Sequence, residues 1–289
     1  MNWTTSRFLI DLTKPKVMGI VNVTPDSFSD GGRYASAHSA LRHCEKLLCD
    51  GADILDIGAE STRPGARPLP TDEELARLLP VLREAVRLDV PVSVDTYKPT
   101  VMQAVLDLGV DIINDVWALR WRGSASGEIA SATQIIATHP TCGVCLMHMH
   151  GEPMTMQLLP MDGDVVAQVR QFLQETATQL EQAGVQRSRI VIDPGIGFGK
   201  TVAQNLALLE RQLELAGASH PLLIGWSRKS SLAAVAGLAN ASDASTEFHS
   251  RLAVSVAAAV LAVERGASIV RVHDVLETVQ ALKVLNAIT

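Results

Sequence analysis

The sequence has little of several features that mark whole classes of protein. Cysteine occurs four times in 289 residues, and the chain does not open with a charged stretch, an apolar core and a small-residue cleavage site. We therefore expect reduced thiols in the cytoplasm, without a disulfide framework. The longest strongly apolar run, residues 252–263, is interrupted by Ser255 and is well short of the roughly 20 residues that cross a bilayer. No membrane span is expected.

Positive charge is also scarce. Lys and Arg total 25 against 31 Asp and Glu, for a net charge of −6, and no basic block is long enough to follow a nucleic-acid backbone. A DNA or RNA partner is therefore disfavoured. Apolar residues make up 47% and charged residues 19% of the chain, which is enough to bury a core and excludes intrinsic disorder.

Short apolar, β-branched runs alternate with amphipathic segments along the chain. The runs are residues 17–23, 53–59, 91–96, 111–116, 143–149, 189–195, 221–227 and 269–275. Each is nearly continuous in apolar residues until its last positions, which is typical of parallel strands covered on both faces. The segments between them are predicted helices, one of which begins with a capping box from Thr71 to Glu74. Eight strand–helix pairs favour an α/β fold, a single-domain (β/α)8 TIM barrel over residues 17–289, with a lead segment over residues 1–16.

Polar side chains gather at the predicted carboxyl ends of these strands, where barrels of this kind carry their chemistry. They are Asn22, Glu60, Arg63, Asp95, Asn114, His148, Asp193, Lys229, Arg271 and His273. The carboxylates and the amide suit the donors and acceptors of a planar heterocycle, and the cationic side chains suit phosphate or carboxylate oxygens. Singly, each could instead be a loop cap or an ion-pair partner, and Arg271 could simply neutralise Asp193 or Asp95 across the barrel.

Two motifs imitate other ligand sites. Residues 193–201 (DPGIGFGKT) approach a Walker phosphate loop, but residue 194 is proline where that loop needs glycine, so an NTPase is not expected. The glycines would instead bring the loop close to a flat ligand, with Phe198 as a packing face. Cys142, Cys145, His148 and His150 have metal-like spacing. On a strand, however, Cys145 points away from the other three, so a zinc site is not expected.

Eight strings follow one another at the predicted strand ends: MGIVNVTPDSFSDGG, GAESTRPGA, VSVDTYKP, IINDV, CLMHMHG, DPGIGFGK, GWSRKS and RVHDV. Together they resemble, across essentially the whole chain, the dihydropteroate synthase family of bacterial folate biosynthesis. The resemblance implies a barrel, usually a homodimer, that uses Mg²⁺. It would condense 6-hydroxymethyl-7,8-dihydropterin diphosphate with 4-aminobenzoate and release pyrophosphate.

The resemblance also implies roles for individual residues. The pterin would be held by Asp95, Asn114, Asp193 and Lys229, and lined by Val116, Met147, Phe198 and Arg271. The diphosphate would be held by Asn22, which would bind Mg²⁺, and by Arg63, Arg271 and His273. The 4-aminobenzoate pocket would be formed by Phe28, Thr62, Arg63, Pro64, Phe198, Lys229 and Ser230. The catalytic set would be Asp95, Lys229, Arg63, Arg271 and His273, with pyrophosphate leaving before the arylamine attacks and no protein nucleophile required.

Two other functions stay open at this point. A methyltetrahydrofolate methyltransferase barrel shares the pterin carboxylates, although the strings TPDSFSDGG and SRKS argue against it. A non-catalytic pterin-binding protein would not need Asn22, Arg63 and His273. Tyr97 and Trp226 depart from the smaller or aliphatic residues typical of the family, which bears on fine specificity. The loop after the second strand has no obvious insertion, which predicts sensitivity to sulfonamides, since these drugs mimic 4-aminobenzoate.

Overall fold

The computed structural model describes residues 1–23, 32–61, 66–121, 130–152, 156, 161–216, 220–238 and 244–288. Eight parallel strands form one sheet in the order β8-β7-β6-β5-β4-β3-β10-β9. They are β3 (Lys16–Asn22), β4 (Ile54–Gly58), β5 (Val92–Asp95), β6 (Ile112–Asp115), β7 (Gly143–Met147), β8 (Ile190–Asp193), β9 (Leu223–Ile224) and β10 (Ile269–Val272). A parallel bridge between Ile192 and Leu222 joins the two ends of this order, so the sheet closes into a barrel. The predicted fold class is confirmed.

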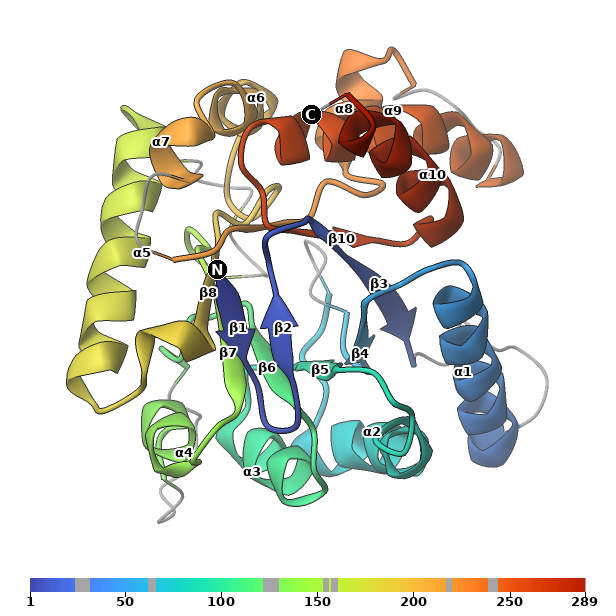
Figure 1. Cartoon of the computed structure of the whole chain (residues 1–289), viewed down its shortest axis with the longest axis vertical. Coiled ribbons are helices and arrows are strands. Elements are labelled where there is room, and N and C mark those ends of the chain that lie inside the picture. The colour runs from blue at the N-terminus through green and yellow to red at the C-terminus, as the bar shows by residue number, and fades with distance from the viewer. Residues whose placement is uncertain are drawn as a thin grey trace.

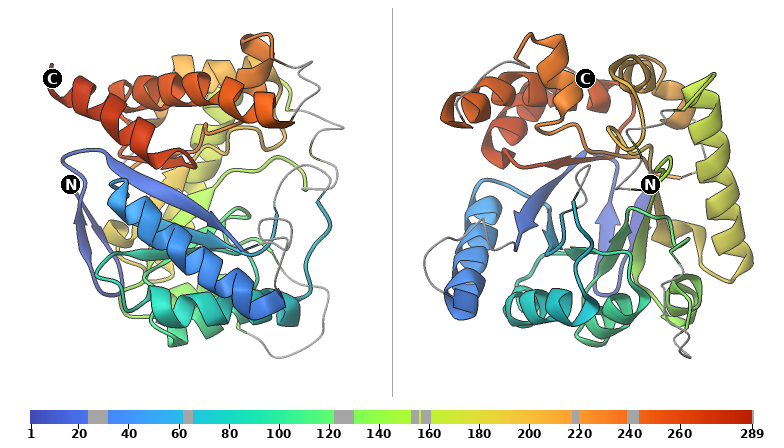
Figure 2. Two further views of the ribbon diagram at one scale, coloured as in Figure 1. Left: turned by 90° about the vertical axis from the view of Figure 1, so that its right-hand side faces the viewer. Right: turned by 180° about the vertical axis from the view of Figure 1, so that it is seen from behind.

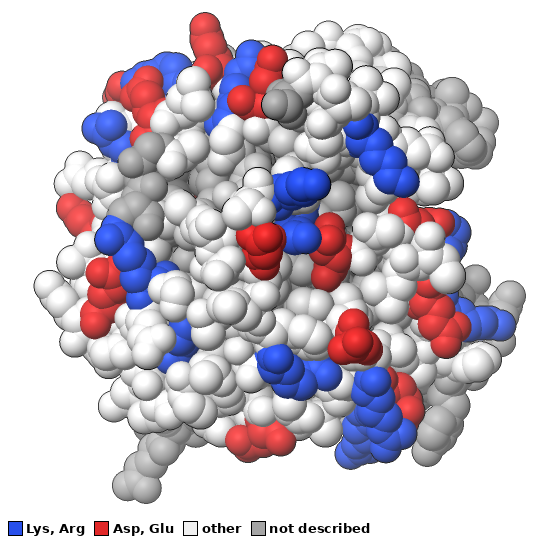
Figure 3. Space-filling model, in the orientation of Figure 1, with Lys and Arg blue, Asp and Glu red and all other residues white. Residues whose placement is uncertain are grey.

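Helices surround this barrel (Figure 1). They are α1 (Gly32–Cys49), α2 (Thr71–Ala85), α3 (Pro99–Asp107), α4 (Ala132–Thr138), α5 (Val165–Gln182), α6 (Val202–Glu210), α7 (Leu213–Ala216), α8 (Ser230–Val235), α9 (Ala244–Glu264) and α10 (Val275–Asn286). Within the described ranges, none of them combines the length and the apolar character that a bilayer crossing requires. On the face drawn in Figure 3, acidic and basic side chains are interspersed in small groups.

The predicted capping box at the start of α2 is wrong. Thr71 is the first helical residue, it follows Pro70, and no side chain caps this helix. The Glu74 carboxylate is turned away to Lys98, whose Nζ lies 2.5 Å from its Oε2. The Glu74 side chain that a capping box requires is therefore engaged in a buried ion pair with Lys98.

The inward-facing residues of the strands form two layers, because side chains alternate between the two faces of a sheet. The lower layer is an apolar cluster that includes Met18, Ile54, Ile112, Cys145, Val191, Leu223 and Ile269. Two residues further along each strand, the next inward positions include Asp56, Asn114, Asp193 and Arg271. The polar layer thus begins one step above an apolar floor. Cys142 belongs to the outer core and Cys145 to this floor, which confirms that the two thiols face opposite ways.

An antiparallel hairpin of β1 (Asn2–Thr4) and β2 (Leu9–Asp11) lies at the floor end of the barrel (Figure 2, left). Trp3 is fully buried in the floor cluster, and its Nε1 donates a hydrogen bond to the Arg189 carbonyl at 2.9 Å. The indole needs the space left by Gly143, where a Cβ would lie 3.0 Å from the same Nε1. The segment predicted as a lead therefore packs against the base of the barrel.

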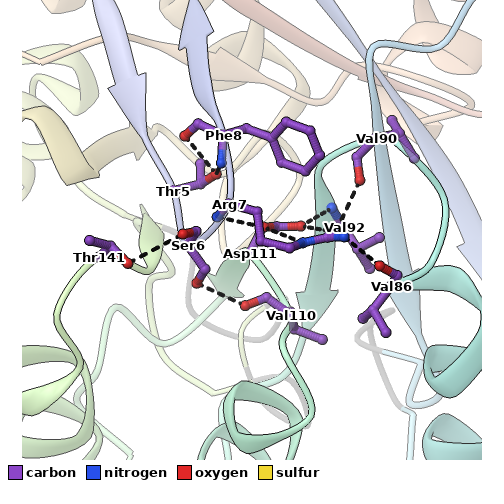
Figure 4. Close-up of polar contacts among 10 residues, drawn as sticks. All are labelled: Thr5, Ser6, Arg7, Phe8, Val86, Val90, Val92, Val110, Asp111 and Thr141. Carbon is purple, nitrogen blue, oxygen red and sulfur yellow. Dashed lines mark hydrogen bonds and ion pairs between the residues drawn. The ribbon is translucent and has the colours of Figure 1, made fainter.

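The turn of this hairpin is anchored by one ion pair (Figure 4). The Arg7 Nε and Nη2 donate to the two oxygens of Asp111 at 3.0 and 2.5 Å, and Nη2 also donates to the Val90 carbonyl at 3.2 Å. Asp111 is fully buried, and it further accepts a hydrogen bond from the Val92 N–H at 2.9 Å. Arg7 therefore connects the hairpin to the segments that enter β5 and β6.

Candidate active site

A cavity of about 480 Å³ opens at the end of the barrel opposite the hairpin. This end of the barrel faces the viewer in the right-hand view of Figure 2. This volume is in the range of small-molecule sites. Its lining includes these predicted residues: Asp95, Asn114, Val116, Met147, Asp193, Phe198, Lys229, Ser230, Arg271 and His273. Asn22 is exposed at the end of β3 and is not among the lining residues. Phe28, Thr62, Arg63 and Pro64 lie outside the described residues.

Arg271 joins two carboxylates at the base of the cavity. Its Nε donates to Asp56 Oδ2 at 2.6 Å, and its Nη2 donates to Asp95 Oδ2 at 2.9 Å. Asn114 Nδ2 donates to the same Asp56 oxygen at 3.2 Å. Of the two aspartates that the sequence offered as ion-pair partners of Arg271, Asp95 is one. The second partner that the structure shows, Asp56, was not predicted. A guanidinium has five N–H donors, so these two bonds do not exhaust it.

The pKa values of this group follow from burial and from the shared charge. Burial lowers the pKa of Arg271, but Asp56 and Asp95 outweigh burial and leave it raised, so the guanidinium stays charged. Burial raises the pKa of Asp95, and Arg271 counteracts part of that rise. The pKa of Asp95 therefore stays above its ordinary value even beside the guanidinium.

Asp193 ends β8 and begins the glycine-rich loop. Its Oδ1 accepts a hydrogen bond from the Gly195 N–H at 2.7 Å. Burial raises the pKa of this carboxyl, opposed by the Gly195 N–H and by Lys229. At Gly195 a Cβ would lie 1.9 Å from the His148 carbonyl oxygen, and at Gly199 it would lie 2.3 Å from that of His150. Both glycines thus bring the loop close to the chain after β7. Gly195 and Gly197 also line the cavity, so the expectation that the glycines let the loop approach a flat ligand stays a prediction.

Lys200 holds the same loop from beneath and was not predicted. Its ammonium is buried and donates to three carbonyl oxygens, those of Gly195 at 2.9 Å, Phe198 at 3.0 Å and His148 at 3.3 Å. Burial lowers the pKa of Lys200 to about 7, although Asp193 acts in the opposite direction. The loop is therefore closed around a lysine that makes no ion pair with a carboxylate among the described residues.

Lys229 and Phe198 are in contact at the cavity wall, with the Lys229 Nζ over the Phe198 ring at 4.4 Å from its centroid. The residue before Lys229, Arg228, has a φ of 59°, in the left-handed region that non-glycine residues rarely occupy. Three hydrogen bonds hold it there: its guanidinium donates to Asp274 at 2.6 and 3.1 Å, and its N–H donates to Ser255 Oγ at 3.0 Å. Lys229 therefore projects from a strained but well-supported turn.

His273 is oriented by a serine on the neighbouring loop. Ser227 Oγ accepts a hydrogen bond from the His273 N–H at 3.1 Å and lies 3.0 Å from His273 Nδ1. Because the oxygen is already an acceptor, its own hydrogen is available to Nδ1. When the hydroxyl donates to Nδ1, the ring presents a proton on Nε2, a donor suited to an anionic oxygen.

A second buried charge cluster flanks the loop after β4. Lys98 Nζ contacts Glu60 Oε2, Glu74 Oε2 at 2.5 Å and the Leu69 carbonyl at 2.5 Å. Burial raises the pKa of Glu74, which Lys98 partly offsets. Tyr97 donates to the other Glu60 oxygen at 2.7 Å. Residues 60 and 69, at the two ends of the loop, thus bond to one ammonium. Tyr97 contributes by holding the Glu60 carboxylate in place.

The turn after β6 is strained and is held by Asp115. The two carboxylate oxygens accept hydrogen bonds from the N–H groups of Trp117 and Leu119, each at 2.7 Å. Ala118 and Leu119 have φ values of 51° and 61°. Burial raises the pKa of Asp115 to about 7, although these N–H groups oppose the rise.

His148 was expected among the polar residues of the cavity, and this expectation is wrong. It is 6% exposed and packs edge-on against the Phe172 ring, with centroids 4.9 Å apart. Burial lowers its pKa to about 2. It follows Met147, which lines the cavity, so strand alternation turns His148 outward to the helices.

Known proteins are similar to this chain in both sequence and fold. Residues 18–273 match the model of a family described as pterin binding enzyme. The dihydropteroate synthase of Neisseria meningitidis serogroup B is 49% identical over 291 residues, which cover 99% of this chain and 97% of that protein. The Burkholderia cenocepacia dihydropteroate synthase in complex with 7,8-dihydropteroate is 47% identical with a TM-score of 0.86, over 99% of this chain and 96% of that one. The Yersinia pestis dihydropteroate synthase with a sulfonamide drug is 40% identical with a TM-score of 0.88, over 100% and 99%.

Proposed function

The chain belongs to the pterin-binding enzyme family and has the activity of a dihydropteroate synthase, and from this premise we propose how its own residues divide the work. The pterin lies at the base of the cavity, against Asp95, Asn114 and Asp193. The 4-aminobenzoate lies nearer the rim, beside Lys229 and Ser230. The observation that carries this assignment is the polar layer above the apolar floor, where carboxylates and an amide face one lined cavity.

The pterin assignment rests on complementary hydrogen bonds. A pterin presents ring N–H and amino groups together with ring nitrogens and a carbonyl, so it needs acceptors and donors side by side. Asp95 and Asp193 supply acceptors, Asn114 supplies both, and Lys229 supplies a donor. Val116, Met147 and Phe198 supply apolar faces for a flat ring, and the Arg271 guanidinium can stack on it while holding Asp56 and Asp95.

We propose a dissociative reaction on this site. The bond from the pterin methylene to the diphosphate oxygen breaks first, the pyrophosphate takes the electron pair, and the methylene is left cationic. The carboxylates of Asp95 and Asp193 face the pterin and stabilise that positive charge. The arylamine nitrogen then forms the new bond and loses a proton to solvent. His273 Nε2–H donates a hydrogen bond to the leaving group, and the cations Arg271 and Arg63 offset its negative charge, with the place of Arg63 resting on the sequence prediction alone.

Magnesium fits this site as an ion that arrives with the diphosphate. Within the described ranges, no group of three or more His, Cys, Asp or Glu side chains could hold a metal ion. Mg²⁺ is usually held by one or two protein oxygens together with substrate phosphates and water, and the exposed Asn22 amide oxygen is suited to that part. When bound, Mg²⁺ would neutralise charge on the leaving pyrophosphate.

A pyrophosphate-release assay tests the activity and the order of steps. Purified protein with Mg²⁺ and both substrates should give dihydropteroate and pyrophosphate in equal amounts. A dissociative reaction should also release pyrophosphate slowly when 4-aminobenzoate is left out. Asp193→Ala and Lys229→Ala should each remove most of the rate. Absence of product at high protein concentration would contradict the activity, whereas strict dependence of pyrophosphate release on 4-aminobenzoate would contradict only the dissociative order.

Sulfonamides should compete with 4-aminobenzoate. The solved Yersinia pestis relative with a sulfonamide drug supports this proposal. The predicted pocket residues Phe28, Thr62, Arg63 and Pro64 would share it with Phe198, Lys229 and Ser230. Raising the 4-aminobenzoate concentration should restore turnover in the presence of drug. Turnover that excess sulfonamide leaves unchanged would contradict the proposal.

We further propose that the protein is a cytoplasmic homodimer. The four cysteines are free thiols, the state that a reducing cytoplasm maintains. Helix α9 exposes Ala253, Ala257 and Leu261 at four-residue spacing on one face, an apolar ridge of the kind that a second subunit covers. Sedimentation should give a dimer, and Leu261→Glu should shift it to a monomer. A monomeric wild-type protein would contradict this proposal.

A further inference from the structure

Asn205 of α6 is a fully buried polar residue that does not line the cavity. Its Oδ1 accepts a hydrogen bond from the Gly197 N–H at 2.8 Å. Its Nδ2 donates to Ser231 Oγ at 3.0 Å and to the Lys200 carbonyl at 3.3 Å. One amide thus uses its acceptor and both donors on two segments, the loop after β8 and the first turn of α8.

These two segments form adjoining walls of the cavity. Gly197 and Phe198 lie in the loop that follows β8, whereas Ser231 follows Lys229 and Ser230 at the start of α8. The walls meet where Lys229 Nζ lies 4.4 Å from the Phe198 ring. Asn205 is behind both walls and bonds to each of them. The separation of Phe198 and Lys229 therefore depends on a side chain that neither of them touches in the described contacts.

We propose that Asn205 is a positioning residue for this reaction. It fixes the Gly197–Phe198 wall relative to the Lys229–Ser230 wall, and so sets where Phe198 and Lys229 stand beside the pterin ring and the arylamine. This inference rests on the proposed placement of the two substrates. A displacement of about 1 Å of such a wall can change a rate a hundredfold, because the reacting atoms must lie within near-contact distance.

The competing explanation is that Asn205 only stabilises the fold. The chain offers a matched control in Gln212, which is 1% exposed and donates to the carbonyls of Ala262 and Arg265 at 2.7 and 3.0 Å. Gln212 is likewise a buried amide that bonds to the main chain of another segment. Its partners lie at the end of α9, which leads into the floor end of β10, and it is not among the residues that line the cavity.

The experiment compares Asn205→Leu with Gln212→Met, each close to isosteric and unable to make the side-chain bonds. Thermal unfolding, kcat, KM for both substrates and the Kd of 7,8-dihydropteroate are measured for each variant and for the wild type. Both variants should lower Tm. Asn205→Leu should lower kcat/KM at least tenfold and weaken dihydropteroate at least tenfold, whereas Gln212→Met should leave both within twofold of the wild type.

Ser231 supplies a milder variant in case Asn205→Leu does not fold. Ser231→Ala removes only the bond to the α8 wall, so KM for 4-aminobenzoate should rise more than KM for the pterin, and Ser231→Thr, which keeps the hydroxyl, should restore it. Kinetic and binding constants within twofold of the wild type, alongside a lowered Tm, would overturn the inference. A wild-type protein without turnover would instead contradict the proposed function, and the dihydropteroate Kd would still test the position of Asn205.

Discussion

Replacing Arg271 by methionine should destabilise the protein in a way that depends on pH. Methionine fills much of the same volume but leaves Asp56 and Asp95 without their shared cation. Asp56 is fully buried, and it would keep only the Asn114 amide as a donor at 3.2 Å. Removing one partner of a buried ion pair costs about 3–5 kcal/mol.

The size of the loss can be worked out from exposure. The Arg271 side chain is 22% exposed and that of Asp95 is 11% exposed, so solvent screens part of the effect and we expect the lower end, about 3 kcal/mol. An unfolding entropy of about 2 cal/mol/K per residue gives about 0.6 kcal/mol/K for 289 residues. The Tm should therefore fall by about 5 °C.

The sign of the pH dependence follows from Asp95. Burial raises its folded-state pKa above that of the unfolded chain, and without Arg271 this pKa moves higher still. Between the unfolded and folded pKa values the unfolded chain binds fewer protons, so stability falls as pH rises. In the variant this fall continues to higher pH. The gap between the two proteins should widen as pH rises beyond the wild-type pKa of Asp95 and narrow below it.

Urea unfolding at a series of pH values measures this gap directly. Arg271→Met combined with Asp56→Asn serves as the control, since the second change removes the stranded buried charge and should recover part of the loss. A loss below 1 kcal/mol, a loss that does not change with pH, or no recovery in the double variant would refute the reasoning. Activity should fall in both variants because Arg271 lines the cavity.

Three further changes probe other parts of the molecule. Arg7→Ala should lower the free energy of unfolding in urea by about 2 kcal/mol with kcat unchanged, because it strands the buried Asp111 while Arg7 itself is 32% exposed. Lys98→Met leaves two buried glutamates without a cation, so the free energy of unfolding should fall by at least about 3 kcal/mol. It also frees both ends of the loop after β4, so KM for 4-aminobenzoate should rise more than KM for the pterin. Asp115→Asn should flatten the pH dependence of stability: with a folded-state pKa of about 7 against 3.8, the wild type should lose up to about 4 kcal/mol as pH rises from about 4 to 7.

Each of these has its own contrary result. Arg87→Ala breaks an exposed ion pair with Glu84 and should lower the free energy of unfolding by less than about 1 kcal/mol. If Arg7→Ala lowered it by no more than this, the Arg7–Asp111 pair would not be an anchor of the hairpin. Equal rises of both KM values in Lys98→Met would separate that lysine from the 4-aminobenzoate side. If the free energy of unfolding of Asp115→Asn still changed with pH between 4 and 7 as in the wild type, this pH dependence would come from other carboxyl groups.

The apolar runs located all eight strands because a parallel strand buried on both faces must be apolar along its length. The run at 53–59 became Ile54–Gly58 and that at 269–275 became Ile269–Val272, so mainly the ends moved. Polar residues at those ends line one cavity for the same reason, since closing the barrel brings the carboxyl ends together. His148 was misplaced although strand alternation had already put it on the face opposite Cys145, because its position near the end of a strand was taken as enough to place it in the cavity.

Two of the residues that the sequence did not reveal, Asp56 and Asn205, have partners far along the chain. Asp56 is bonded by Asn114, 58 positions away, and by Arg271, 215 positions away. Asn205 bonds to Ser231 across 26 positions. Asp56 is the one polar residue of its strand, and Asn205 follows Gln204 in a helix, so nothing local shows whether either side chain is satisfied. Counting two residues onward from an inward-facing apolar position would have found Asp56, whereas the role of Asn205 needs the packed walls.

The pairing of β3 with β10 has a consequence for synthesis on the ribosome. Lys16 pairs with Ile269 and Gly19 with Val272, so the first barrel strand gains its second neighbour only when nearly the whole chain has been made. At about 5–20 residues per second, that edge of β3 waits for roughly 10 to 50 s. Its seven residues are buried over most of their length in the finished barrel. This open apolar edge is therefore the segment of the nascent chain most exposed to mispairing, and it is where a chaperone would have most to protect.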